Sequence, residues 1–229
     1  MLEPSLIKQY VWEPVNSNSY LITENNKGLL IDAVDSQELY EAIKPLKKLT
    51  IILTHCHFDH ISGLNTIREL KPDCEVITTS LCSDFIGNAH RNMSAVANVF
   101  MMFYNKTEEE KDLVNPYVCE PANKVFEEKM NFNWNDHEIN LLAVHGHSSD
   151  GLIAILDDKY MFSGDSLLSI PTVTRFPNGN SKKFSLEDIP LFKSLNQKLV
   201  VYPGHGETGS IKDMLEVNIK HKKRITNNN

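Results

Sequence analysis

The sequence predicts an α/β fold, and three observations carry that prediction. Short apolar runs with β-branched residues, typical of strands, alternate with helix-like segments over the first 80 residues. The strand pattern returns from Glu138 onward. Histidine and aspartate residues gather directly after several of these strands, as in enzymes whose active sites lie on loops at strand ends. The length of 229 residues fits a single domain, so we expect one domain over residues 1–229.

The individual elements follow from local pattern. The expected strands cover residues 20–23, 28–31, 50–53, 75–78, 139–144, 151–156, 160–162 and 199–202. Turns at residues 24–27 and 157–159 join two of these pairs into hairpins. One helix is expected to begin near Asp35, which opens a capping-box pattern, and a second is expected to cover residues 63–70. A last helix is expected to begin after Ser210.

Residues 81–135 differ from the rest of the chain. Their apolar residues recur on one helical face: Met93, Val96, Phe100 and Phe103. We therefore expect a mostly helical insertion in this region. It would serve as local core, as a lid facing the substrate, or as a homodimer surface, because Met-rich faces adapt to partners.

Composition and charge exclude several classes of protein. Hydrophobic residues make up 41% and charged residues 23%, which argues against a disordered chain. The formal net charge is −7, so no nucleic-acid partner is expected. The apolar runs are too short for a membrane span, and residues 1–8 lack the order of a signal peptide. The four cysteines have no CxxC spacing, which favours reduced thiols in a cytoplasmic protein.

A dense group of metal-binding residue types follows the strand at 50–53. It reads His55-x-His57-x-Asp59-His60. Imidazole is a good ligand for zinc and iron, and a carboxylate neutralises metal charge. His55 and His57 can face one metal if the segment is extended, whereas a loop could aim Asp59 and His60 at a second. Cys56 is expected to point away from its histidine neighbours as a small core residue.

Three further residues of the same chemistry each follow an expected strand. They are His147 in a Gly-His-Ser motif, Asp165 in a Gly-Asp-Ser motif, and His205 in a Pro-Gly-His-Gly motif. The neighbouring glycines permit tight turns that push a side chain into a cleft. The sequence therefore predicts a metal site built from several strand ends.

These four motifs, in this order, resemble those of the metallo-β-lactamase superfamily. The resemblance covers nearly the whole chain apart from residues 81–135, and by motif the chain is most similar to glyoxalase II-like hydrolases, with lactonases near by. It implies an αββα sandwich with the metals at one edge. It also implies that His55, His57 and His147 hold one metal, that Asp59, His60 and His205 hold another, and that Asp165 bridges them.

The activity implied by the resemblance is metal-dependent hydrolysis of a small molecule. Two divalent ions would share a hydroxide that attacks an ester, thioester or lactone, and Asp59 would help to orient it. Zinc is the first expectation, and the same ligands accept iron or manganese. The alternatives are a mononuclear iron dioxygenase acting on a persulfide and a metal-binding relative without enzymatic activity.

Substrate contacts are expected on the loop at residues 170–177, which follows Asp165 closely. Arg175 in this loop could pair with a carboxylate or phosphate of the substrate, although a surface role is the commoner function of an arginine. His145 stands where the superfamily usually has proline, and we expect it to support the site without binding metal.

Overall fold

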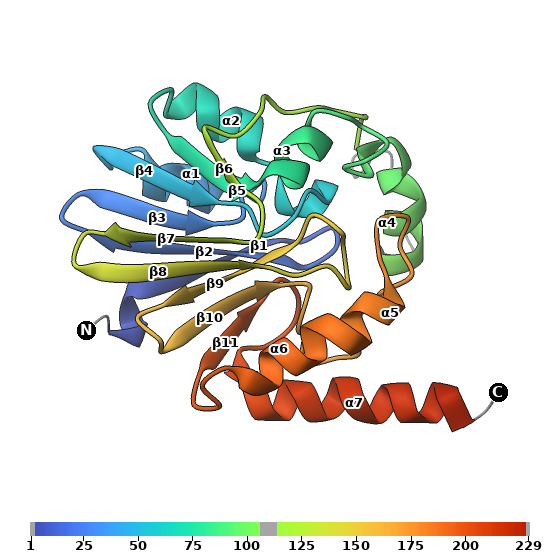
Figure 1. The fold of residues 1–229 in the computed structure, drawn as a ribbon. Helices are drawn as coiled ribbons and strands as arrows, with labels where there is room; N and C mark the ends of the chain where they lie inside the picture. The colour runs from blue at the N-terminus through green and yellow to red at the C-terminus, as the bar shows by residue number, and fades with distance from the viewer. Residues whose placement is uncertain (1–2, 106–113, 228–229) are drawn as a thin grey trace. The chain divides into compact units, whose positions relative to one another are not determined.

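The structure, a computed structural model, describes residues 3–105 and 114–227. Its strands form two six-stranded mixed sheets flanked by helices, which confirms the expected α/β class (Figure 1). The chain divides into two compact units at Glu127, and each unit contains one of the sheets. We call Leu2–Glu127 the N-terminal unit and Glu128–Asn229 the C-terminal unit.

The sheet of the N-terminal unit runs in the order β1-β2-β3-β4-β5-β6. Its strands are β1 (Ile7–Trp12), β2 (Ser17–Glu24), β3 (Lys27–Ile31), β4 (Lys48–Ile52), β5 (Glu75–Thr79) and β6 (Lys124–Phe126). The first three pair antiparallel, whereas β3 to β6 pair in parallel. The parallel connections carry helices α1 (Gln37–Ile43), α2 (Leu64–Leu70), α3 (Ser80–Ile86) and α4 (Ala97–Asn105).

Local chemistry explains where these elements begin and turn. Asn25 and Asn26 adopt positive φ of 52° and 59°, as a two-residue hairpin turn between β2 and β3 requires. Ser36 caps α1, since its hydroxyl accepts from the Leu39 amide at 3.4 Å and donates to Glu38. The cap is therefore Ser36 and not Asp35, so the third helical position is Leu39 and the predicted capping box of Asp35 and Glu38 is wrong, although the helix begins where it was expected. In the described part of the chain, no helix is long and apolar enough to cross a membrane.

The sheet of the C-terminal unit runs in the order β12-β11-β10-β9-β8-β7. Its strands are β7 (Lys129–Trp134), β8 (His137–Ala143), β9 (Leu152–Leu156), β10 (Tyr160–Gly164), β11 (Val200–Pro203) and β12 (Gly209–Ser210). β10 and β11 pair in parallel and the other neighbours antiparallel. Asp157 and Asp158, with φ of 54° and 49°, form the predicted turn between β9 and β10.

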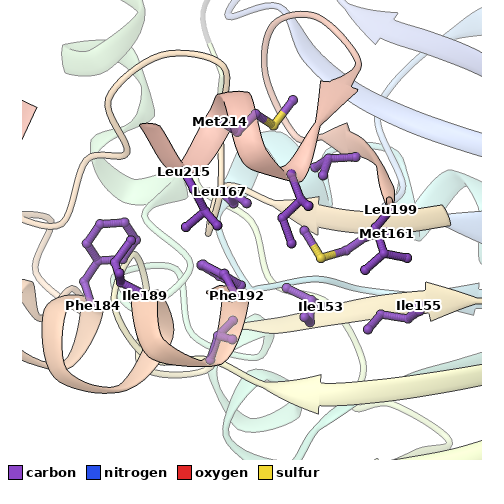
Figure 2. Packing of buried hydrophobic residues seen from close by; sticks show 13 residues of the cluster. Ile153, Ile155, Met161, Leu167, Phe184, Ile189, Phe192, Leu199, Met214 and Leu215 are labelled. Carbon is purple, nitrogen blue, oxygen red and sulfur yellow. The ribbon is translucent and has the colours of Figure 1, made fainter. Parts of the chain in front are cut away.

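One hydrophobic core holds the C-terminal unit together. Helices α6 (Ile189–Ser194) and α7 (Ile211–Asn227) pack their apolar sides onto β9, β10 and β11 (Figure 2). Ile153, Met161 and Phe192 are completely buried in this core. Burial of each such side chain stabilises the folded unit by roughly 1.5–3 kcal/mol. The residues that follow these strands are therefore attached to a firmly packed core.

The region predicted as a helical insertion contains both helices and strands. Helices α3 and α4 occupy its first half, residues 106–113 lie outside the described residues, and residues 124–126 and 129–134 form β6 and β7. In β7, partly buried and exposed side chains alternate, a strand periodicity that the helical expectation overlooked. That this region is an insertion into one domain, or a homodimer surface, stays a prediction.

Candidate metal centre

The N-terminal unit brings together the four ligands predicted at residues 55–60. β4 ends at Ile52, the chain bends at Thr54 and then forms a 3₁₀ turn at Phe58–His60, so the side chains of Asp59 and His60 leave the backbone in a new direction. All four side chains are buried, and the His55 Nε2 and His57 Nδ1 atoms lie 3.1 Å apart. The His60 Nε2 atom lies 3.5 Å from a carboxylate oxygen of Asp59.

Asp32, which is not among the predicted ligands, organises this loop. It directly follows β3 and adopts φ of 59°, a left-handed conformation that aspartate tolerates better than most residues. One carboxylate oxygen accepts from the Thr54 amide at 2.7 Å. The other accepts from the Thr54 hydroxyl and from His60 Nδ1, each at 2.8 Å. An aspartate directly after a buried strand is the signal by which Asp165 was found, and it applied here as well.

These hydrogen bonds fix which imidazole nitrogen can bind a metal. A carboxylate only accepts, so the Nδ1 atom of His60 carries a proton and Nε2 of the neutral ring offers a lone pair. The Thr54 hydroxyl gives its single proton to Asp32, and therefore accepts from His55 Nδ1 at 3.1 Å. His55 in its neutral form also offers its lone pair at Nε2.

Residues from β1 and β2 hold the backbone of the same loop. The Ser17 hydroxyl donates to the carbonyl oxygen of Asp59 at 2.9 Å. The ring of Trp12 meets the ring of Phe58 edge to face, with centroids 5.9 Å apart. These contacts leave the loop little freedom to reorient its ligands.

The C-terminal unit brings together the other three predicted ligands, each from a different strand end. His147 follows β8, Asp165 follows β10, and His205 follows β11. One carboxylate oxygen of Asp165 lies 3.6 Å from His147 Nε2 and 3.5 Å from His205 Nε2. Gly164, with φ of 48°, makes the turn that aims Asp165. A carboxylate between two imidazoles is the arrangement expected of a bridging ligand.

The loop after Asp165 contacts His147, and its predicted role in substrate contacts stays a prediction. The carbonyl oxygen of Val173 accepts from His147 Nδ1 at 2.7 Å, so neutral His147 also offers Nε2. The Phe176 ring meets the His147 ring edge to face, with centroids 5.5 Å apart. Arg175 lies between these two residues of the loop and is exposed.

A buried carboxylate fixes the turn that carries His147. Asp188 is 2% exposed and accepts from the amides of His145 and Gly146 at 3.1 and 2.7 Å. Burial raises the pKa of Asp188, while the two amide hydrogen bonds oppose that rise. A Cβ at Gly146 would lie 2.4 Å from an Asp188 oxygen, so only glycine fits. The His145 ring donates from Nδ1 to the carbonyl of Ser149 at 2.9 Å.

The distances within each unit fit a bound divalent metal. Each of the seven residues offers an imidazole nitrogen or a carboxylate oxygen. Tetrahedral coordination with bonds of 2.0–2.2 Å would place neighbouring ligand atoms about 3.3–3.6 Å apart. The three nitrogen–carboxylate separations are 3.5, 3.5 and 3.6 Å. For neutral His60 and His147, whose Nδ1 atoms donate elsewhere, the Nε2 lone pair faces a carboxylate and is repelled by it, and a cation between them removes the repulsion.

Comparison with known proteins adds an independent line of evidence. A family model described as the metallo-beta-lactamase superfamily matches residues 12–205, a stretch that contains all seven residues. A probable metallo-hydrolase of Streptococcus pyogenes is 27% identical over 207 residues, which cover 85% of this chain and 81% of that protein. Hydroxyacylglutathione hydrolase of Glaesserella parasuis is 22% identical, over 90% of this chain and 69% of its own.

Solved structures with the same fold cover nearly the whole chain. The BLEG-1 B3 metallo-beta-lactamase aligns with a TM-score of 0.73 at 20% identity, over 93% of this chain and 97% of its own. The protein TTHA1623, solved in a di-iron-bound form, aligns at 0.71 and 25% identity, over 92% and 98%. ETHE1 from Myxococcus xanthus aligns at 0.65 and 23% identity, over 90% and 80%.

Proposed function

The chain belongs to the metallo-β-lactamase superfamily, and from that premise we propose that it is a dinuclear metal-dependent hydrolase of a small-molecule ester, thioester or lactone. The metallo-β-lactamase fold expected from the motifs is confirmed. The relatives named as metallo-hydrolase and hydroxyacylglutathione hydrolase support hydrolysis, and the second of these names supports a thioester-like substrate. At 22–27% identity, they leave the substrate itself to be proposed from the residues of this chain.

The observation that carries the proposal is the fixed protonation of the imidazoles. His55, His60 and His147 each have Nδ1–H held by an oxygen acceptor, which leaves Nε2 as the ligand atom. His137 and His145 also donate from Nδ1 to an oxygen, so the distinguishing feature of the other three is that each Nε2 atom faces another of the seven predicted ligands. We propose that one ion is held by His55, His57 and His147, a second by Asp59, His60 and His205, and that Asp165 bridges them.

The residues of the chain would then divide the work of hydrolysis. Two bound divalent ions supply Lewis acidity toward a carbonyl oxygen and lower the pKa of water. The Asp59 carboxylate orients the attacking water, since Ser17 fixes its backbone and the neighbouring His60 is fixed by Asp32. The low solvent exposure of the ligands excludes bulk water from competing hydrogen bonds.

Arg175 is the proposed anchor for an anionic group of the substrate. Its neighbours Val173 and Phe176 contact His147, while its own side chain is exposed. Arg175→Ala should raise KM about tenfold for anionic substrates and leave kcat and the KM of neutral substrates unchanged. Lys182→Ala, which removes an exposed cation from α5 (Ser181–Lys183), is the matched control. An unchanged KM for the anionic substrates would remove Arg175 from the site.

Zinc is the proposed metal, and iron is the competing identity. The ligand set of imidazoles and carboxylates accepts both metals, and the related TTHA1623 was solved with two irons. Metal analysis of protein produced in defined medium, followed by reconstitution with zinc, iron or manganese, would identify the ion that supports turnover.

The deciding experiment for the activity is a panel of thioester, lactone and persulfide substrates. We expect about two metal ions per chain and hydrolysis of a thioester or lactone without oxygen consumption. Oxygen uptake with a persulfide at one iron per chain would instead establish the dioxygenase alternative. Two bound ions with no turnover across the panel would favour a metal-binding protein without this activity, and far less than one ion per chain would overturn the proposal.

A further inference from the structure

Two stretches of the predicted insertion contact the loop of residues 55–60, which carries four of the proposed metal ligands. We call residues 88–96 and 114–119 the backing segments. The Cys56 thiol donates to the carbonyl of Arg91 at 3.4 Å, and the Tyr117 hydroxyl donates to the carbonyl of Phe58 at 2.5 Å. Cys56 and Phe58 are buried and alternate with the ligands along the chain. The backing segments therefore contact Cys56 and Phe58, which lie between the proposed ligands of this loop.

A buried polar network fixes the backbone of Tyr117. Asn92 and Ser94 are 0% and 1% exposed, and both donate to the Tyr117 carbonyl, at 3.0 and 2.9 Å. The Ser94 oxygen also accepts from the Tyr117 amide at 3.0 Å. Between them, Met93 adopts φ of 66°, an unfavourable conformation for a side chain of this type. Because this buried network is hydrogen-bonded and holds a strained backbone turn, it fixes the position of Tyr117 firmly.

The hydroxyl of Tyr117 is a permanent donor. Burial raises the pKa of Tyr117 well above the ordinary value of 10.0, and the nearby Cys119 and Asp59 raise it further. The bond that it makes is with the peptide carbonyl that joins Phe58 to Asp59. Rotation of that peptide would redirect the Asp59 side chain relative to His57, and metal affinity depends on such angles.

We propose that Tyr117 is a positioning residue for the metal site: its hydrogen bond to Phe58 orients the peptide before Asp59 and so sets the metal affinity of residues 55–60. The inference rests on the proposed function, because it requires that this loop binds metal. It gives the predicted insertion a role as the support of the ligand loop.

Tyr117→Phe tests the proposal, because it removes one hydroxyl and keeps the ring. Zinc affinity, measured by competition with a chelating indicator, should weaken about tenfold, the lower end of the effect of groups that orient metal ligands. Tyr10→Phe is the matched control, since Tyr10 is a partly buried tyrosine of β1 in the same unit, where it borders a surface hollow lined by Lys8, Leu21 and Leu46. Its zinc affinity should stay within about twofold of the original protein.

The melting temperatures of both variants separate positioning from simple stability. A purely structural role would lower the melting temperature of Tyr117→Phe and leave its zinc affinity unchanged, and that result would overturn the inference. If the unaltered protein binds no zinc, iron or manganese, the proposed function fails first. If it binds metal normally and Tyr117→Phe does too, only this inference fails.

Amide hydrogen exchange in the unaltered protein provides a test that needs no variant. If the backing segments and the loop are linked, zinc must slow exchange of the Ser94 and Tyr117 amides, which donate to Asn92 and Ser94 at 2.8 and 3.0 Å. The Cys74 amide, which donates to Lys71 at 2.9 Å, is the internal control and should not change. Equal exchange at Ser94 and Tyr117 with and without bound zinc would overturn the proposal.

Discussion

The two units carry the proposed metal ligands in opposite ways. In the N-terminal unit, the ligands follow one another along residues 55–60, directly after β4. In the C-terminal unit, His147, Asp165 and His205 come from three strand ends that are far apart in sequence. The ligands at residues 55–60 share one short stretch of backbone, so side chains from other parts of the chain must hold that backbone in place. His147, Asp165 and His205 follow strands whose backbones are held by the sheet, so only the short turn before each ligand needs a special backbone conformation.

The supporting contacts follow this difference. Side-chain groups of Asp32, Ser17 and Tyr117 fix the N-terminal loop. In the C-terminal unit, the main devices are the positive φ of Gly164 and the close contact of Gly146 with Asp188. The comparison therefore predicts that the two ligand sets will fail in different ways when altered.

The largest effect is expected at Asp165, since its carboxylate faces both His147 and His205. Asp165→Ala should remove both metals and lower activity about a thousandfold or more. Asp157→Ala, which removes a carboxylate bonded to His137 in the same unit, should retain both metals. Metal content by mass spectrometry together with turnover measures the effect. Two tightly bound ions in Asp165→Ala would refute the bridging role.

Asp32→Asn should have the next largest effect and should reveal the dependence of the continuous set on outside support. Asparagine tolerates the positive φ of Asp32, but its single oxygen can replace only one of the two carboxylate oxygens. Its NH2 group must then face either the Thr54 amide or the Thr54 hydroxyl and His60 Nδ1, all of which need an acceptor. Metal affinity should fall about 10–100-fold while the protein stays folded. Asp35→Asn is the control. Unchanged affinity of Asp32→Asn would show that the loop holds its ligands without this carboxylate.

Gly146→Ala should affect stability more than metal affinity. The added Cβ would lie 2.4 Å from an Asp188 oxygen and 2.5 Å from Phe184, so the turn must shift. The expected loss is roughly 1–3 kcal/mol in the free energy of unfolding, measured with urea. Gly87→Ala, whose nearest contact would be an ordinary 3.5 Å, should stay within about 0.5 kcal/mol. Equal losses in both variants would mean that Asp188 does not confine the turn.

The smallest effect is a change in pH dependence at Asp188. Burial raises its pKa in the folded protein, so the stability that it contributes is fully present below the unfolded value of about 3.8 and is lost as pH rises through the folded value. Asp188→Asn removes this titration. The free energy of unfolding of the original protein, relative to Asp188→Asn, should therefore decline as pH rises from about 3.8. Parallel pH profiles for the two proteins would contradict the raised pKa.

Local patterns made most strands and the seven proposed ligands visible in the sequence. Residues such as His147 stand directly after an apolar run and beside glycine, and both signals lie within a few positions. The contacts of the supporting residues could not be read from the sequence, because their partners are distant along the chain. His60 and Asp32 are 28 residues apart, Gly146 and Asp188 42, and Phe58 and Tyr117 59. Only the folded chain brings such pairs together.

The mixed pattern of residues 124–134 shows a second limit. Met130, Phe132 and Trp134 alternate with polar residues and form one side of β7, although the preceding helical segment suggested more helix. Pairing with β8 decides the outcome there, and this pairing depends on residues outside the segment.

The central claim is that both ligand sets complete one dinuclear centre. Anomalous diffraction from crystals of the protein loaded with zinc or iron tests it most directly. We expect two peaks, one bound by His55, His57 and His147, the other by Asp59, His60 and His205, with Asp165 between them. A single peak, or peaks bound only by residues of one unit, would contradict it.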